Sequence, residues 1–124
     1  CRGRETDKSR KRARGAGLFV CDSKGDERGG FSTLDDGSVV LALDAPVGVG
    51  DPMRDRVGMS VFPDGSAYVM LLDNQTRGVA KLIHDVSSGT GGVQLFQWND
   101  STRKVNIKTL TYDGHETATY DLGK

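Results

Sequence analysis

Turn-forming residues interrupt this sequence so regularly that they leave little room for a helix. From residue 17 onward, short apolar runs alternate with segments such as LDDGS, FPDGS, SSGTGG and TYDGH. Val, Leu, Ile, Thr, Phe and Tyr dominate the runs, and these residues favour strands. We expect strands over residues 18–21, 29–34, 38–43, 56–62, 67–72, 78–84, 93–98, 104–110 and 116–122. The pattern predicts an all-β fold, an antiparallel meander of eight or nine short strands built from repeated hairpins.

The turn segments have a physical explanation that needs no ligand. In FPDGS, Pro63 presets φ for a type I turn and Gly65 can adopt the left-handed conformation that follows. Together they predict a three-residue hairpin loop with a glycine bulge. LDDGS and TYDGH have the same layout. We expect the carboxylates of Asp36, Asp64 and Asp113 to accept hydrogen bonds from turn amides.

The turns recur at a spacing that indicates a repeated unit. An arginine precedes an aspartate by eight residues in three places, Arg28 to Asp36, Arg56 to Asp64 and Arg77 to Asp85. Such spacing is typical of a supersecondary element that stacks on its neighbours. The segments 45–53 and 87–91 interrupt the spacing as insertions. The pattern arginine, strand, Asp-Gly, strand, Asp-x-x-Gly/Thr, arginine resembles tandem β-hairpin repeats of uncharacterised bacterial proteins over residues 22–124, and the resemblance implies architecture only.

Two of the expected strands are apolar on both faces. Residues 39–43 read VVLAL and residues 67–72 read AYVMLL, whereas residues 116–122 alternate as expected for a strand with one solvated face. Both faces of an apolar strand must be covered. We therefore expect a homo-oligomer or another protein partner, with a two-layer sandwich or a closed barrel as the monomeric alternative to stacked sheets.

Charge divides the chain into a basic arm and an acidic body. Residues 1–14 hold seven Lys/Arg and two Asp/Glu, about +5, and the remaining residues hold ten and fifteen, about −5. We divide the chain into a flexible arm, residues 1–16, and a β-repeat domain, residues 17–124. The arm's Lys8, Arg10, Lys11, Arg12 and Arg14 are candidates for contact with nucleic acid or an anionic surface. A solvated tail, or an arm that folds back on the acidic body, is favoured, because like-charge blocks are usually solvated and no aromatic residue lies within the arm.

The sequence leaves the compartment open. No apolar run approaches the length of about 18–20 residues that spans a bilayer, and no signal-peptide pattern is visible. The chain begins with Cys1, as a mature lipoprotein would. Cytoplasmic and secreted or lipoprotein locations therefore both remain open.

Residues typical of catalysis and metal binding are sparse. There is no phosphate loop, nucleophile elbow or dinucleotide fingerprint. The two histidines, His84 and His115, each precede a carboxylate and could form a general base, but a surface hydrogen bond is the commoner role. Asp44, Asp51 and Asp55 lie in one stretch that lacks the EF-hand spacing, which favours a structural loop. We expect no catalytic residue, no metal and no cofactor.

Trp98 is the candidate for ligand binding. It ends the run VQLFQW and precedes Asn99 and Asp100, and an aromatic ring beside polar groups suits a carbohydrate or a peptide. The alternative is a core aromatic residue at the end of a strand. The sequence thus predicts a non-catalytic structural or interaction domain that self-associates. The alternative function is a small carbohydrate- or peptide-binding β-module that uses Trp98, Asn99 and Asp100.

Overall fold

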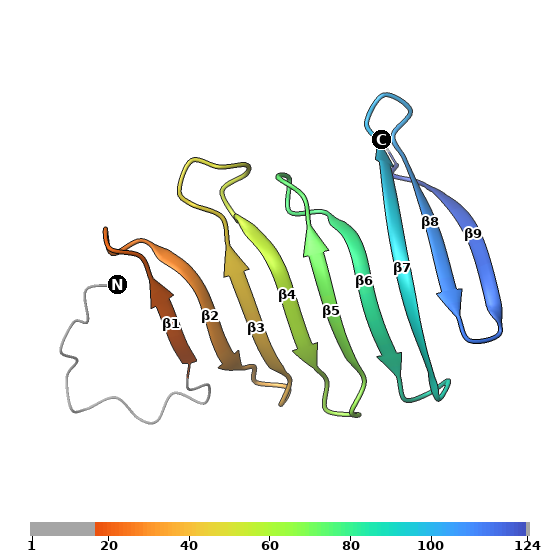
Figure 1. The fold of residues 1–124 in the computed structure, drawn as a ribbon, viewed down its shortest axis with the longest axis horizontal. Coiled ribbons are helices and arrows are strands. Elements are labelled where there is room, and N and C mark those ends of the chain that lie inside the picture. The colour runs from red at the N-terminus through yellow and green to blue at the C-terminus, as the bar shows by residue number, and fades with distance from the viewer. Residues whose placement is uncertain (1–16, 124) are drawn as a thin grey trace.

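Nine antiparallel strands form one sheet in the computed structural model, which describes residues 17–123. The strands are β1 (Gly17–Cys21), β2 (Glu27–Thr33), β3 (Val39–Asp44), β4 (Asp55–Val61), β5 (Ala67–Leu72), β6 (Gly78–Asp85), β7 (Thr90–Asn99), β8 (Lys104–Thr111) and β9 (Gly114–Asp121). Each strand pairs with the next one along the chain, so that the order in the sheet is the order in the sequence (Figure 1). The predicted all-β meander is confirmed, and each expected run overlaps one strand.

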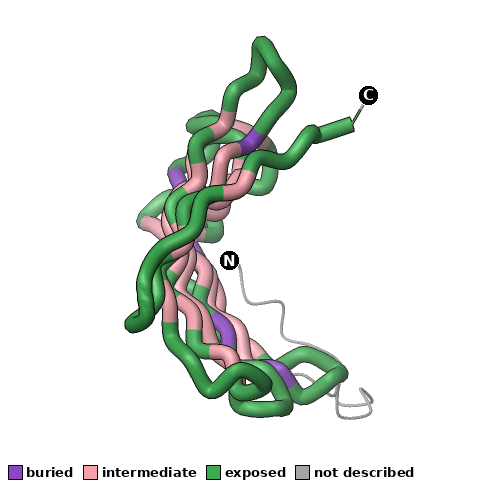
Figure 2. The backbone as a smooth tube through the Cα atoms, turned by 90° about the vertical axis from the view of Figure 1, so that its right-hand side faces the viewer, coloured by how far each residue is buried: buried purple, intermediate pink, exposed green. Residues whose placement is uncertain are grey.

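The sheet is a single open layer. Viewed edge-on, it curves and twists, with no second layer on either side among the described residues (Figure 2). In residues 17–123, the buried apolar side chains are those of Ala45 and Val105 alone. The described chain therefore forms neither a two-layer sandwich nor a closed barrel, and of the expected arrangements the open stack of hairpins remains. The same residues contain no helix long and apolar enough to cross a membrane.

Four of the turns share one geometry, and two of these four are the predicted turns LDDGS and FPDGS. In each turn the first residue donates its amide to the carbonyl four residues later and accepts from the amide three residues later, starting at Asp22, Leu34, Phe62 and Asp73. The third loop residue has a positive φ, which is 90° at Gly37 and 89° at Gly65. Oδ1 of Asp36 and of Asp64 accepts the amide of the serine two residues later, at 2.8 Å in both turns. The predicted glycine bulges of LDDGS and FPDGS are confirmed.

The prediction for TYDGH was wrong. Thr111 lies directly opposite Gly114, so the hairpin loop contains only Tyr112 and Asp113. Gly114 begins β9 instead of filling a bulge position. The ladder between β8 and β9 continues without interruption to the loop, and this pairing leaves no third residue for the expected turn.

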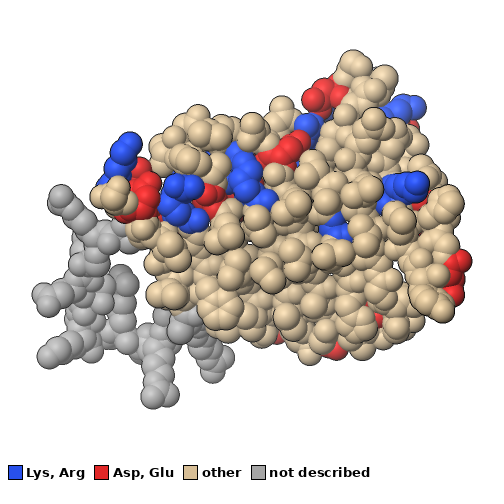
Figure 3. All heavy atoms as spheres, viewed as in Figure 1, with Lys and Arg blue, Asp and Glu red and all other residues tan. Residues whose placement is uncertain are grey.

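The eight residues from each arginine to the following aspartate span one strand, so the two residues lie at opposite ends of the sheet. Arg28, Arg56 and Arg77 lie at the end that holds the β1–β2, β3–β4, β5–β6 and β7–β8 loops, which we call the arginine end. Figure 3 shows Lys/Arg and Asp/Glu side chains gathered along this end, with few charges over the face below it. Since consecutive strands run in opposite directions, Asp36, Asp64 and Asp85 lie at the other end.

The longer insertion is anchored to the neighbouring turn. Asp51 donates its amide to the carbonyl of Asn74 at 2.8 Å, and Thr76 Oγ1 donates to Asp51 Oδ1 at 2.5 Å. Thr76 has a φ of 54° at the position that glycine occupies in the other three turns of this kind. The hydroxyl that glycine lacks supplies the second contact, so Thr76 joins the β3–β4 loop to the β5–β6 turn.

Candidate functional site

One face of the sheet carries an uninterrupted row of apolar side chains. Directly opposed residues of an antiparallel pair share a face. Following the pairing from β1 to β8, the opposed residues are Leu18, Phe31, Leu41, Met59, Val69, Leu82, Val93 and Leu110. We call this side of the sheet the apolar face. Its central row crosses eight strands without a polar residue.

A second row on the apolar face runs beside the first. Its members on β1 to β7 are Val20, Gly29, Leu43, Val57, Leu71, Ala80 and Leu95. Many of the large side chains in the two rows are open to solvent in the single chain, including Leu18 at 67% exposure, Leu82 at 56% and Phe31 at 51%. The two rows contain no Asp, Glu, Lys or Arg on β1–β7. Exposed apolar patches of this extent are rare on monomeric proteins and mark interaction sites.

Polar side chains limit the apolar face at β8 and β9. Asn106 Nδ2 donates to Gln97 Oε1 at 3.4 Å, and Thr119 Oγ1 donates to Asn106 Oδ1 at 2.8 Å. The second row continues from Leu95 into Lys108 and Thr117. The apolar face is thus a bounded patch over β1–β7, rimmed by polar residues on the β8–β9 side.

The opposite side of the sheet, which we call the mixed face, is composed differently. Its central row alternates small, apolar and polar residues in the order Phe19, Gly30, Ala42, Gly58, Met70, Lys81, Gln94, Thr109 and Glu116. Large side chains on this face contact one another: the ring centroids of Phe62 and Tyr68 are 5.7 Å apart, and Lys81 Nζ lies 4.8 Å from the centroid of the Tyr68 ring. The mixed face therefore covers part of its own apolar surface, whereas Leu18, Phe31 and Leu82 of the apolar face stay more than half exposed.

A groove of about 670 Å³ lies on the apolar face over β4–β8. Met59, Leu82 and Val93 are among its lining residues, together with Ala67 and Gly91. Ala67 and Gly91 belong to a third row, in which Val61, Ala67, His84 and Gly91 are opposed in turn. Because alanine has only a methyl group and glycine has no side chain, the surface is hollowed there.

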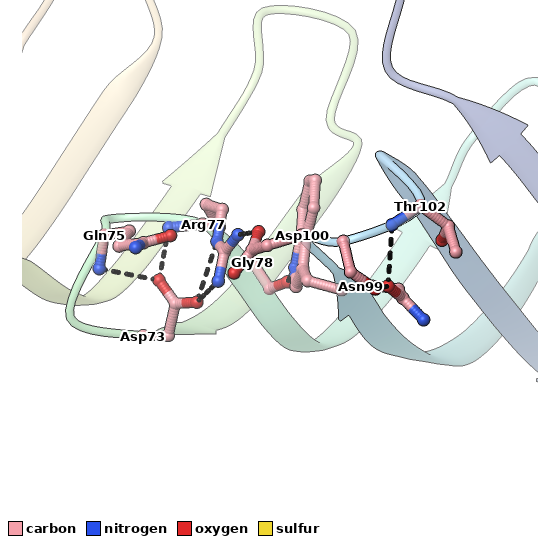
Figure 4. Close-up of polar contacts among 9 residues, drawn as sticks. Asp73, Gln75, Arg77, Gly78, Asn99, Asp100 and Thr102 are labelled. Carbon is pink, nitrogen blue, oxygen red and sulfur yellow. Dashed lines mark hydrogen bonds and ion pairs between the residues drawn. The ribbon is translucent and has the colours of Figure 1, made fainter.

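Two of the predicted ligand-binding residues, Asn99 and Asp100, lie near Arg77 and Gly78 at the arginine end (Figure 4). Trp98 Nε1 donates to the carbonyl of Gly78 at 2.7 Å, and the Arg77 guanidinium lies 5.0 Å from the centroid of the Trp98 ring. Arg77 also bridges two turns, since its Nε donates to Asp73 Oδ2 at 2.9 Å and its Nη1 to Asp100 Oδ1 at 2.6 Å. The hydrogen bond to Asp73 is the main cause that raises the pKa of Arg77.

The contacts of Asn99 and Asp100 each engage the Oδ1 atom of the side chain. Asn99 Oδ1 accepts from the amide of Thr102 at 3.0 Å and from Ser101 Oγ at 2.8 Å. Trp98 lies on the mixed face, opposite to Val93 and Leu95 as the alternation predicts, and is half-buried. The structure brings Trp98, Asn99 and Asp100 together as part of a turn-to-turn clasp. Ligand binding by these three residues stays a prediction.

The histidines do not share a face with the carboxylates beside them. His84 and Asp85 are consecutive on β6, and His115 and Glu116 are consecutive on β9. Since consecutive strand residues point to opposite faces, neither sequence pair forms a His–carboxylate contact across its own strand. His84 instead lines the apolar groove.

Two carboxylates are opposed at the base of the long β3–β4 loop. Asp44 lies directly opposite Asp55. Burial, followed by the hydrogen bond and the charge of Asp44, raises the pKa of Asp55, and Asp44 Oδ1 is buried without a hydrogen-bond partner. Asp51 Oδ1 accepts hydrogen bonds from Thr76 Oγ1 and from the amide of Arg54, the latter at 3.1 Å. In the described range, no three His, Cys, Asp or Glu residues are grouped so as to hold a metal ion.

The basic candidates lie outside the described residues. Lys8, Arg10, Lys11, Arg12 and Arg14 precede residue 17, so the prediction of a nucleic-acid or anionic-surface contact stays untested. No protein-family model matches the chain, and no curated protein sequence matches it. The apolar face is therefore the feature of the described chain from which a function can be argued.

Sequence reasoning missed the apolar face as a whole, although part of the signal was present. Leu18 and Val20, Val57 and Met59, and Val93 and Leu95 each stand two residues apart within a strand, as one face requires. What the sequence lacked was the register between strands, which decides whether these pairs lie on the same side of the sheet.

Proposed function

We propose that this domain is a non-catalytic interaction and structural module, which binds a protein surface through its apolar face. The observation that carries the proposal is the central row of Leu18, Phe31, Leu41, Met59, Val69, Leu82, Val93 and Leu110, which is apolar over eight strands. From the sequence we expect self-association because two strands are apolar on both faces, and the apolar face is a surface through which two copies could associate.

The energetics of a single layer support this proposal. Ordering the backbone costs about 1–2 kcal/mol per residue, and burial of apolar surface is the main term that offsets this cost, at about 25 cal/mol per Å². Ala45 and Val105 are the buried apolar side chains of residues 17–123, so the described chain alone has almost no core. Covering the apolar face supplies the missing burial. A sheet is stable when such a face packs against another layer.

Charge favours a protein surface over a lipid surface. The central rows of the apolar face on β1–β7 contain no cationic side chain, whereas interfacial lipid-binding surfaces combine apolar and Lys/Arg side chains. At the arginine end, Arg28, Arg56 and Arg77 donate hydrogen bonds to backbone carbonyls or carboxylates of the same chain. These guanidinium groups are therefore engaged within the sheet.

A substitution on the apolar face tests the proposal. Leu82→Asp places a charge in the central row, and Thr117→Asp places the same charge on β9, in the polar border of the same side. We expect the purified protein either to assemble or to bind a hydrophobic fluorescent dye strongly, and Leu82→Asp to change that behaviour while Thr117→Asp does not. Sedimentation and dye fluorescence give the two measurements. A folded monomer that binds no dye, or equal behaviour of the two variants, would contradict the proposal.

A further inference from the structure

We propose that the surface that covers the apolar face is a second copy of this chain. The inference rests on the proposed function, because it names the partner of the same face. In this arrangement two sheets stack with their apolar faces together, related by a two-fold axis that runs along β4 and parallel to the strands. The interface is then isologous, with the same patch contributed by both copies.

The size of the apolar face suits such a dimer. Strands in a sheet lie about 4.8 Å apart and rise about 3.3 Å per residue, so six spacings from β1 to β7 and about six to seven residues of height give a footprint of roughly 570–670 Å². A stable interface takes about 600–1,000 Å² from each partner. The face of a second copy therefore supplies an area at the lower end of this range without further elements.

The axis along β4 pairs exposed apolar side chains across the interface. On the apolar face Leu18 of β1 is 67% exposed, Leu82 of β6 56% and Phe31 of β2 51%, and the groove lies over β4–β8. A two-fold axis along β4 exchanges β1 with β7 and β2 with β6, and it leaves the position along the strands unchanged. In the central row, Phe31 of each copy then lies over Leu82 of the other and Leu18 over Val93, and both Leu82 and Val93 line the groove.

Polarity selects this axis over the alternative. An in-plane axis perpendicular to the strands would place β9 on β9, and would bury the polar residues His115, Thr117 and Thr119 against their own copies. With the axis along β4, strands β8 and β9 extend beyond the partner and their polar side stays in water. The strands of the two copies also run in aligned directions, which two sheets of the same twist require when they pack about 10 Å apart.

Photocrosslinking in the full chain tests this inference. A photoreactive benzophenone side chain replaces Phe31, and the matched control carries it in place of Thr117. We expect irradiation to join two copies through position 31, at twice the chain mass of 13.3 kDa, with the attachment on β6 or β7 of the other copy. The control should give at least about ten-fold less dimer, because position 117 lies outside the stacked area.

Every other result of these measurements would overturn a stated part of the proposal. Attachment between the two positions 31 would overturn the axis along β4. A monomer that binds the hydrophobic dye would overturn the second copy and leave the proposed function standing, whereas a monomer that binds no dye would overturn both. Strong co-sedimentation of the monomer with neutral phosphatidylcholine vesicles would identify the partner as a lipid surface, and would also overturn both.

Discussion

The indole Nε1 of Trp98 donates a hydrogen bond of 2.7 Å to the carbonyl oxygen of Gly78, at the first residue of β6. Val79, the next residue, is the extra residue where the register of β5 and β6 shifts between Leu71 and Leu72. Arg77 lies over the same indole ring. Trp98 therefore fastens the bulged start of β6 to the end of β7, which explains why an aromatic residue with a donor stands there.

We expect Trp98→Phe to lower the free energy of unfolding by about 1–2 kcal/mol, because the Gly78 carbonyl loses its donor and Arg77 loses its best aromatic partner. Tyr120→Phe is the control, since Tyr120 is 55% exposed. Urea denaturation followed by far-ultraviolet circular dichroism measures the difference at one fixed protein concentration, because association adds to apparent stability. Equal stability of the two variants would show that the clasp contributes nothing.

Asp55→Asn should stabilise the protein at neutral pH. The pKa of Asp55 is raised above 3.8 by burial and by Asp44, so the folded chain holds this proton more tightly than the unfolded chain. The stability that protonated Asp55 contributes is present below pH 3.8 and is lost as pH rises through its raised pKa. Asparagine removes the repulsion between opposed like charges, which is about 0.5–1 kcal/mol for a cross-strand pair.

The pH dependence separates this effect from a general change. We expect the gain from Asp55→Asn at pH 7 to vanish below pH 3.8, where the aspartate is protonated in both states. Asp36→Asn should instead lower the stability at pH 7, because the hydrogen bond from the Ser38 amide lowers the pKa of Asp36 and favours its ionised form. Thermal unfolding from pH 3 to pH 8 measures both. A gain from Asp55→Asn that is constant over this range would contradict the account.

Gly50→Ala tests the anchoring of the β3–β4 loop. A Cβ at Gly50, whose φ is 78°, would clash with the Asn74 carbonyl oxygen and with the Arg56 guanidinium, whereas a Cβ at Gly48, at φ 85°, would meet no atom within 4 Å. Both alanine variants lose about 1 kcal/mol of stability because alanine disfavours the left-handed backbone. Only Gly50→Ala also has to displace the loop from the turn. We expect Gly50→Ala to cost about 1–2 kcal/mol more than Gly48→Ala.

Amide exchange provides the specific readout for that loop. The Asp51 amide, which donates to Asn74, should exchange faster in Gly50→Ala than in Gly48→Ala. Unchanged protection of Asp51 in Gly50→Ala would mean that the loop is not held by the β5–β6 turn.

The sequence was sufficient for the strands and for most turns, because both depend on local chemistry. Alternation within each run and the Asp-Gly pairs located nine strands and the bulged turns at Gly37 and Gly65. The turn at Gly114 failed because cross-strand pairing with Thr111 decided its length. The apolar row depends on registers such as Leu41 opposite Met59, which join residues distant in the sequence. The role of Trp98 was likewise hidden, since its partner Gly78 lies twenty residues away.

Methionine oxidation in the purified protein tests the central claim, that a second copy covers the apolar face. Met59 lies in the central row and is 43% exposed in the single chain, and Met53 in the β3–β4 loop is 68% exposed. Dilute peroxide followed by peptide mass spectrometry gives the rate of sulfoxide formation at each residue. We predict that Met59 reacts at least about ten-fold more slowly than Met53 in the assembled protein, and that the two rates converge in denaturant. Oxidation of Met59 at nearly the rate of Met53 in the folded protein would contradict the account.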